Sequence, residues 1–198
     1  MDCTALHRLR LKDAFGDVQQ FQDVTCDAEF LEELFEWTIR GIIFIYDDDD
    51  AGHSVFVADT RGLGSDKTLR VLNATHKDLF LWHIDGVMYR KGSKCDCAFI
   101  SDNYIGFVEF KANAANNSDE AIKANYEKAT MQLKQTVDDV IKRCQNAGID
   151  VMASTMVEAY AVFNPTVPRH NAYQKKMAAK FLMETDGIPL YFTNSAEI

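Results

Sequence analysis

Three residues near the middle of the chain, Asp96, Glu109 and Lys111, have the side chains that metal-assisted phosphate chemistry uses. Two strand-like segments carry them, and a tight turn at residues 102–103 joins these segments. The turn is Asp-Asn, and both residue types tolerate the left-handed backbone of a two-residue hairpin loop. With that loop, Ser101 faces Tyr104, and counting outward predicts that Asp96 lies opposite Glu109.

Side chains alternate between the faces of a strand, so Glu109 and Lys111 are expected on one face together with Asp96. Two facing carboxylates repel each other unless a proton or a cation lies between them. Magnesium suits such a pair because it takes one or two protein carboxylates and keeps water or phosphate oxygens as its other ligands. Lys111 would then hold the attacking water or stabilise charge developing on a phosphate.

A simpler interpretation is a salt-bridged hairpin in which Lys94 and Lys111 neutralise the two acids, as surface ion pairs often do. The opposite face of the hairpin is apolar and is predicted to belong to the core. Its expected members are Cys95, Cys97, Phe99, Gly106, Val108 and Phe110.

The order of these residues resembles the signature of the PD-(D/E)XK nuclease superfamily, which includes restriction endonucleases, Holliday-junction resolvases and repair exonucleases. The family motif is an Asp on one strand and an acid-x-Lys on the next, followed by a helix. Here Asp96 is followed by Glu109-Phe110-Lys111 and then by a helical pattern containing Ala129-x-x-Gln132-Leu133, which is similar to a glutamine motif of exonuclease-like branches. The match covers about residues 85–165. No glutamate lies between Glu36 and Glu109, so the upstream acid of many members has no counterpart of that type.

The resemblance implies a restriction-endonuclease-like α/β core, with a mixed central β-sheet flanked by helices. It implies that Mg²⁺ or Mn²⁺ is bound by Asp96, Glu109 and the main-chain carbonyl of Phe110. It further implies that Lys111 and Gln132 act in catalysis with the two acids, and that the substrate is nucleic acid, with DNA preferred to RNA.

Composition agrees with an ordinary globular α/β chain of 198 residues, of which 47% are hydrophobic and 26% charged. The sequence contains neither a membrane-length apolar stretch nor a signal-peptide pattern at its start, and a cytoplasmic location is therefore expected. The five cysteines form no CxxC pair, so buried free thiols are expected rather than a structural zinc site. The five histidines form no recognisable motif with a Ser or Cys nucleophile; they are His7, His53, His76, His83 and His170.

The net charge of −9 is concentrated in the first third of the chain. Residues 1–60 hold 14 acidic and four basic residues, while the remainder has a net charge of +1, with basic residues gathered between Arg61 and Lys94. This asymmetry predicts two regions, an acidic segment at 1–60 packed on a nuclease-like core at 61–198. The acidic segment would repel nucleic acid and is a candidate surface for a protein partner, and a homodimer is a further alternative.

Hydrophobic periodicity predicts the remaining elements. Strands are expected over residues 5–15, 42–46, 55–57, 157–163 and 190–193, and helices over 27–41, 117–148 and 173–183. Residues 66–90 fit strands, or a short helix followed by a strand. The four aspartates at 47–50 fit a solvated turn better than a calcium loop.

Two functions follow from these observations. The first is a metal-dependent nuclease that cleaves phosphodiester bonds with a metal-activated water. The alternative is a catalytically inactive module of the same fold that acts through protein contacts. A small-molecule enzyme has no phosphate loop, dinucleotide fingerprint or triad to support it.

Overall fold

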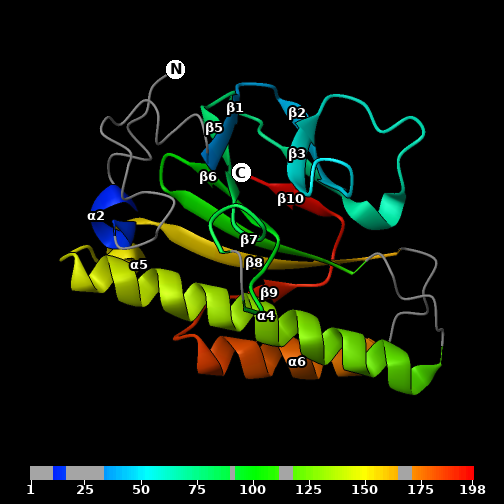
Figure 1. Ribbon diagram of the computed structural model, residues 1–198. Coiled ribbons are helices and arrows are strands. Elements are labelled where there is room, and N and C mark those ends of the chain that lie inside the picture. Colours follow the sequence, from blue (N-terminus) through cyan, green and yellow to red (C-terminus); the bar gives the residue numbers. More distant parts are fainter. Residues whose placement is uncertain (1–10, 17–33, 90–91, 112–117, 165–170) are drawn as a thin grey trace.

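The computed structural model describes residues 11–16, 34–89, 92–111, 118–164 and 171–198 (Figure 1). These residues form a mixed α/β architecture of two β-sheets and a helical layer. None of the helices in this part of the chain is long and apolar enough to cross a lipid bilayer.

The main sheet has six strands in the order β1-β5-β6-β7-β8-β9. Antiparallel pairing joins β1 to β5, β5 to β6 and β6 to β7, whereas β8 pairs in parallel with both β7 and β9. The strand bounds are β1 Phe35–Thr38, β5 Leu79–His83, β6 Cys97–Ser101, β7 Tyr104–Lys111, β8 Met156–Phe163 and β9 Leu190–Tyr191.

The second sheet has four strands in the order β10-β4-β2-β3. Its C-terminal strand β10 runs parallel to β4, and the other pairs are antiparallel. The bounds are β2 Ile42–Asp48, β3 His53–Val57, β4 Thr68–Leu72 and β10 Ser195–Glu197. A short 3-10 helix, η2, spans Ser65–Lys67 before β4.

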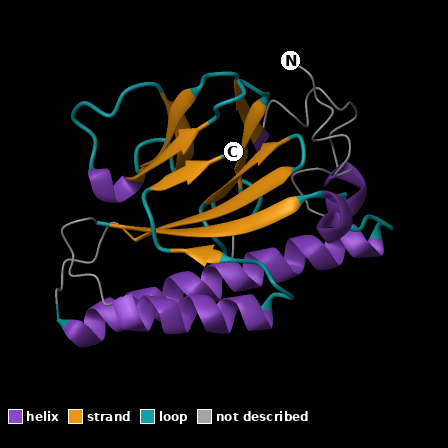
Figure 2. Cartoon of the chain, turned by 180° about the vertical axis from the view of Figure 1, so that it is seen from behind, coloured by secondary structure: helices purple, strands orange, loops and turns teal. Residues whose placement is uncertain are grey.

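The helices are α2 Leu11–Phe15, α4 Asp119–Asn146, α5 Val151–Ser154 and α6 Asn171–Glu184. The long helices α4 and α6 run side by side along one face of the main sheet, as the views from the two sides agree (Figures 1 and 2). The stripe predicted for α4 is buried as expected, from Ile122 to Cys144. The helix begins with Ser118 as its N-cap, whose Oγ accepts a hydrogen bond from Ala121 N.

Two apolar clusters hold the three layers together, and each uses one face of the main sheet. The first lies between the sheet and the helices and includes Phe107, Tyr126 and Leu133. The second lies between the two sheets and includes Ile45 and Phe99. The described helices therefore cover one face of the central sheet and the second sheet covers the other, whereas the sequence predicted helices as the flanking layers. The restriction-endonuclease-like topology stays a prediction.

The predicted hairpin is confirmed in its register, because Ser101 pairs with Tyr104 and Cys97 with Val108. Gly106 lies opposite Phe99, and a Cβ atom at residue 106 would come within 2.3 Å of the Phe99 ring. A glycine is therefore required here because the Phe99 ring of the neighbouring strand packs closely over residue 106.

Two predicted elements near the N-terminus are wrong where the structure describes them. Residues 11–15 form α2 instead of a strand, and residues 35–38 form β1 instead of the end of a helix. Phe35 and Trp37 lie in this edge strand, where aromatic residues are favoured, and Phe35 stacks on Trp82 of the neighbouring strand. The predicted residues 5–10 and 27–33 of these elements lie outside the described residues.

The other predicted strands and the C-terminal helix are confirmed, except that the strand predicted over 190–193 is limited to Leu190–Tyr191. Residues 66–90 contain β4 and β5. Strands from both sides of residue 60 pair with each other, since β1 pairs with β5 and β2 with β4. The residues described before position 60 thus pack on those that follow, and the division into two regions stays a prediction.

Candidate active site

The candidate site lies where β6 begins, beside the end of β7 and the middle of α4. The main chain of Asp96 fixes this arrangement: its N–H donates to the Val108 carbonyl at 3.1 Å, and its carbonyl accepts from Ile84 N at 3.3 Å and Asp85 N at 3.1 Å. Because Cys97 also pairs with Val108, the consecutive residues Asp96 and Cys97 both oppose Val108, as in a β-bulge. Such an irregularity redirects side chains and often lies next to functional sites.

The bulge explains why one prediction about the hairpin faces is wrong. Cys95 was expected beside Cys97 on the face away from the acids, but Cys95 packs in the cluster under α4 while Cys97 packs between the sheets. Regular alternation begins only at Cys97, the first residue of β6. Both thiols are free and buried, as predicted.

Glu109 is the most deeply buried charged residue of the site, with only 1% of its surface exposed. It lies in β7 opposite Ala161 of β8, and its Oε1 accepts from the Lys111 ammonium. Its other oxygen, Oε2, is buried and has no hydrogen-bond partner among the described residues. An ionised carboxylate with one unpaired buried oxygen is costly, so the site is suited to receive a cation or a proton there.

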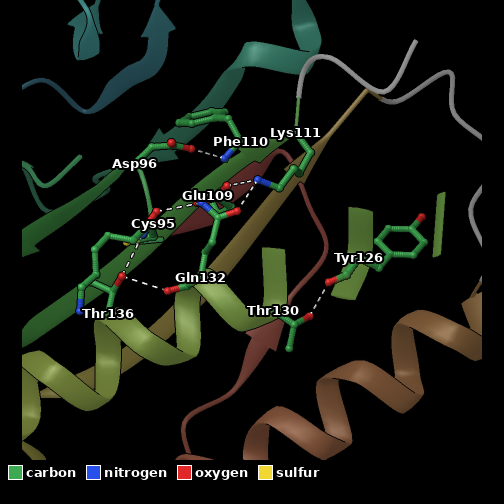
Figure 3. A network of polar contacts seen from close by, with 10 residues as sticks. Cys95, Asp96, Glu109, Phe110, Lys111, Tyr126, Thr130, Gln132 and Thr136 are labelled. Carbon is green, nitrogen blue, oxygen red and sulfur yellow. Dashed lines mark hydrogen bonds and ion pairs between the residues drawn. The ribbon is translucent and has the colours of Figure 1, made fainter. Parts of the chain in front are cut away.

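Asp96 lies half-buried next to Glu109, and its Oδ2 accepts a hydrogen bond from Phe110 N at 2.6 Å (Figure 3). This contact ties the Asp96 carboxylate to the strand that carries the second acid. The negative charge of Asp96 also contributes to the raised pKa of Glu109, so the two carboxylates are electrostatically coupled. The expected position of Asp96 directly opposite Glu109 stays a prediction, because the paired register of the hairpin ends at Cys97 and Val108.

Gln132 joins the site from α4 and is almost fully buried. Its Oε1 accepts from Lys111 Nζ at 2.8 Å (Figure 3). Its Nε2 donates to the Lys94 carbonyl at 2.9 Å. Lys111 is thus held between Glu109 and Gln132. The structure brings together all five residues predicted for the site, namely Asp96, Glu109, Phe110, Lys111 and Gln132.

A buried threonine fastens this helix to the segment before β6. Thr136 Oγ1 donates to the Gln132 carbonyl at 3.0 Å and accepts from Cys95 N at 2.8 Å. One turn further along the helix, Asp139 Oδ2 accepts a hydrogen bond from the Tyr89 hydroxyl and lies 3.5 Å from Lys94 Nζ. Lys94 therefore pairs with Asp139 on α4, and the interpretation in which it neutralises the hairpin acids is wrong.

Burial dominates the electrostatics of the two acids. It raises the pKa of Asp96 to about 7, against the opposing effect of the Phe110 N–H. It also raises the pKa of Glu109 well above its ordinary value, and the neighbouring Asp96 charge adds to this rise while Lys111 opposes it. Both carboxylates would therefore bind protons near neutral pH unless a cation neutralised their charge instead. A divalent metal ion would be such a cation.

Asp85 is a further acid at this site that the sequence interpretation missed. Its N–H bonds the Asp96 carbonyl, and its negative charge contributes to the raised pKa of Asp96, of Glu109 and of Asp47 in β2. Asp85 Oδ1 accepts a hydrogen bond from Gly86 N, as in a local turn. The sequence offered one clue, which is that Asp85 shortly precedes the strand segment that carries Asp96. The bulge that aligns Asp85 with Asp96 could not be predicted from the sequence.

A scan against protein-family models found no match, and neither the curated proteins nor the solved structures contain a significant match to this chain.

Proposed function

We propose that the protein is a Mg²⁺- or Mn²⁺-dependent nuclease whose active site is built on Asp96, Glu109, Lys111 and Gln132. One observation carries the proposal: Glu109 is buried beside Asp96 with an unpaired oxygen, while its other oxygen holds the lysine that follows two residues later. A purely structural ion pair would not require a second acid next to the first.

The chain's own residues divide the work as follows. Asp96, Glu109 and the Phe110 carbonyl are the groups that would hold the metal ion, which when bound supplies positive charge and a water of lowered pKa. Lys111 is positioned to orient the attacking water or to stabilise negative charge on the phosphate. Gln132 keeps the Lys111 ammonium in place through its Oε1, and its own amide is anchored on Lys94.

DNA is the proposed substrate and a restriction-endonuclease-like core the proposed topology. The resemblance of the Asp96, Glu109-x-Lys111 and Gln132 motifs supports both, together with a mixed sheet that has a long helix on one face. The free thiols of Cys95, Cys97 and Cys144 support a cytoplasmic location.

A catalytically inactive module that binds a protein is the second candidate, and the pairing of the basic residues favours it. A nuclease needs basic side chains that contact the phosphate backbone, yet several of those between residues 61 and 94 form ion pairs within the chain. These pairs are Arg61–Asp59, Lys67–Asp49, Lys77–Asp102 and Lys94–Asp139. The acidic first 60 residues would then offer a surface for a basic partner, and self-association as a homodimer is a further form of such contact.

Cleavage assays with matched variants separate the two candidates. Purified protein is incubated with single- and double-stranded DNA and with RNA, in Mg²⁺, in Mn²⁺ or in excess chelator. We expect metal-dependent cleavage by the wild type and a loss of at least about 100-fold in Asp96→Asn, Glu109→Gln and Lys111→Met. Asp138→Asn and Lys134→Met are the controls, because they remove a more exposed ion pair on α4 and should cleave normally.

Two results would contradict the nuclease proposal. Cleavage at the wild-type rate by all three site variants would place any activity elsewhere or in a contaminant. An inactive wild type on every substrate and metal would favour the protein-binding module.

A further inference from the structure

A second cluster of metal-binding side chains lies between the two sheets and shares no residue with the candidate active site. Its members are Glu36 of β1, His83 of β5 and His53 at the start of β3. One ligand atom from each of the three side chains lies within 4.8 Å of the other two. Among the described residues, no other group of three His, Cys, Asp or Glu side chains comes this close together.

Strand pairing explains why these residues converge. Glu36 pairs with Leu81, and Leu81 packs in the cluster between the sheets, so Glu36 faces the second sheet. His83 lies two residues after Leu81 and therefore projects from the same face. His53 comes from the second sheet and meets His83 edge-on, with ring centroids 4.5 Å apart and planes at 65°.

The carboxylate is oriented in the way a metal ligand requires. Glu36 Oε2 accepts a hydrogen bond from Phe56 N at 2.8 Å. Its Oε1 lies 3.9 Å from His83 Nε2, so one oxygen is fixed by the main chain and the other points at the imidazole. Such outer contacts commonly orient ligands around a metal ion.

His83 is the most buried member of the cluster, with only 5% of its surface exposed. Burial first, and the neighbouring His53 second, lower the pKa of His83 and so favour its neutral form. A neutral imidazole offers a lone pair to a metal ion. His53 and Glu36 are half-buried, which leaves the cluster open to solvent on one side.

We propose that Glu36, His53 and His83 form a binding site for a divalent transition-metal ion, best matched by Zn²⁺, that links the two sheets. Two imidazoles and a carboxylate are a common zinc ligand set, with water as the fourth ligand. Magnesium and calcium prefer oxygen ligands and are disfavoured here. Ligand atoms around a tetrahedral zinc lie roughly 3.3 Å apart for bonds of about 2 Å, so small side-chain movements would close the cluster.

The site was missed from the sequence because its three residues are separated by up to 47 positions and come from two sheets. No local spacing marks it. In addition, residue 36 was expected within a helix over 27–41, and that expectation is wrong because residue 36 belongs to β1.

The experiment titrates the metal-free, full-length protein with Zn²⁺ against a chromophoric chelator. We expect the wild type to bind one Zn²⁺ ion tightly. His53→Ala and Glu36→Gln should each bind this ion with an affinity lowered by about 100-fold or more. Glu36→Gln keeps an oxygen that can accept from Phe56 N, so it tests the charge without removing the contact. His76→Ala is the matched control, because His76 is exposed and lies outside the cluster, and it should bind zinc as the wild type does.

X-ray absorption at the zinc edge and thermal unfolding complete the test. The wild-type spectrum should show nitrogen and oxygen ligands with imidazole scattering, and zinc should raise the unfolding temperature of the wild type but not of His53→Ala. Asp96→Asn should retain the zinc effect, which keeps this site independent of the proposed nuclease site. Equal zinc binding by the wild type, His53→Ala and Glu36→Gln, or a sulfur-dominated spectrum, would overturn the proposal.

Discussion

Replacing Asp96 by Asn should stabilise the metal-free protein at neutral pH. Asn keeps an oxygen that can accept the 2.6 Å hydrogen bond from Phe110 N, while the charge is removed. The burial that raises the Asp96 pKa from 3.8 to about 7 makes its charged form unfavourable in the folded state. Keeping both acids at the proposed metal site therefore lowers the stability of the metal-free protein.

The sign and the size follow from proton linkage. Below about pH 4 the carboxyl is protonated in both states and contributes nothing. Between about pH 4 and 7 the unfolded chain releases the proton that the folded protein retains, so the wild type loses stability as pH rises. The rise in pKa from 3.8 to about 7 corresponds to roughly 4 kcal/mol above pH 7, and about 2 kcal/mol is expected if the half-buried side chain is partly screened.

Urea unfolding in the presence of chelator, at pH values from 4 to 8, measures this effect. The Asp96→Asn variant should equal the wild type near pH 4 and exceed it by about 2 to 4 kcal/mol at pH 7.5. Asp138→Asn, an exposed acid on α4, should show no comparable pH-dependent gap. Adding Mg²⁺ at pH 7.5 should stabilise the wild type and not Asp96→Asn, by about 2.7 kcal/mol at 100 times the dissociation constant. A difference between wild type and variant that stays constant across this pH range would refute the reasoning.

Two further substitutions test the packing that positions the site. Gly106→Ala should lower the free energy of unfolding by about 1 to 3 kcal/mol, because its Cβ would lie 2.3 Å from the Phe99 ring. Denaturant unfolding measures this loss, and adding Phe99→Leu should restore part of it. A Gly106→Ala variant as stable as the wild type would disprove the close contact. Thr136→Val should lower the free energy of unfolding by about 1 to 3 kcal/mol in the same assay, because Cys95 N loses its buried hydrogen-bond acceptor. Unchanged stability would show that this hydrogen bond is not formed.

The elements that could be predicted were those whose signal is local. The stripe on α4 repeats every three to four residues, so its buried face followed from periodicity alone. The hairpin register followed from its two-residue turn, as far out as Cys97 opposite Val108. Gln132 reached the site because the helix that carries it packs on β7 at that point.

The features that were missed depend on contacts distant in sequence. Strand β10 pairs with β4 across more than 100 residues, so the second sheet had no local signature. The segment at 35–38 has an apolar spacing that also suits a helix, and its pairing with β5 decided the outcome. The bulge at Asp96 reversed the expected face of Cys95 and brought Asp85 to the site.

Anomalous diffraction from crystals soaked in Mn²⁺ tests the central claim most directly. The account predicts a manganese peak between the carboxylates of Asp96 and Glu109, within about 2.0 to 2.3 Å of an oxygen from each, and its loss in Glu109→Gln crystals. Crystals with a fully accessible site and no peak there, or a peak that persists unchanged in Glu109→Gln, would contradict it.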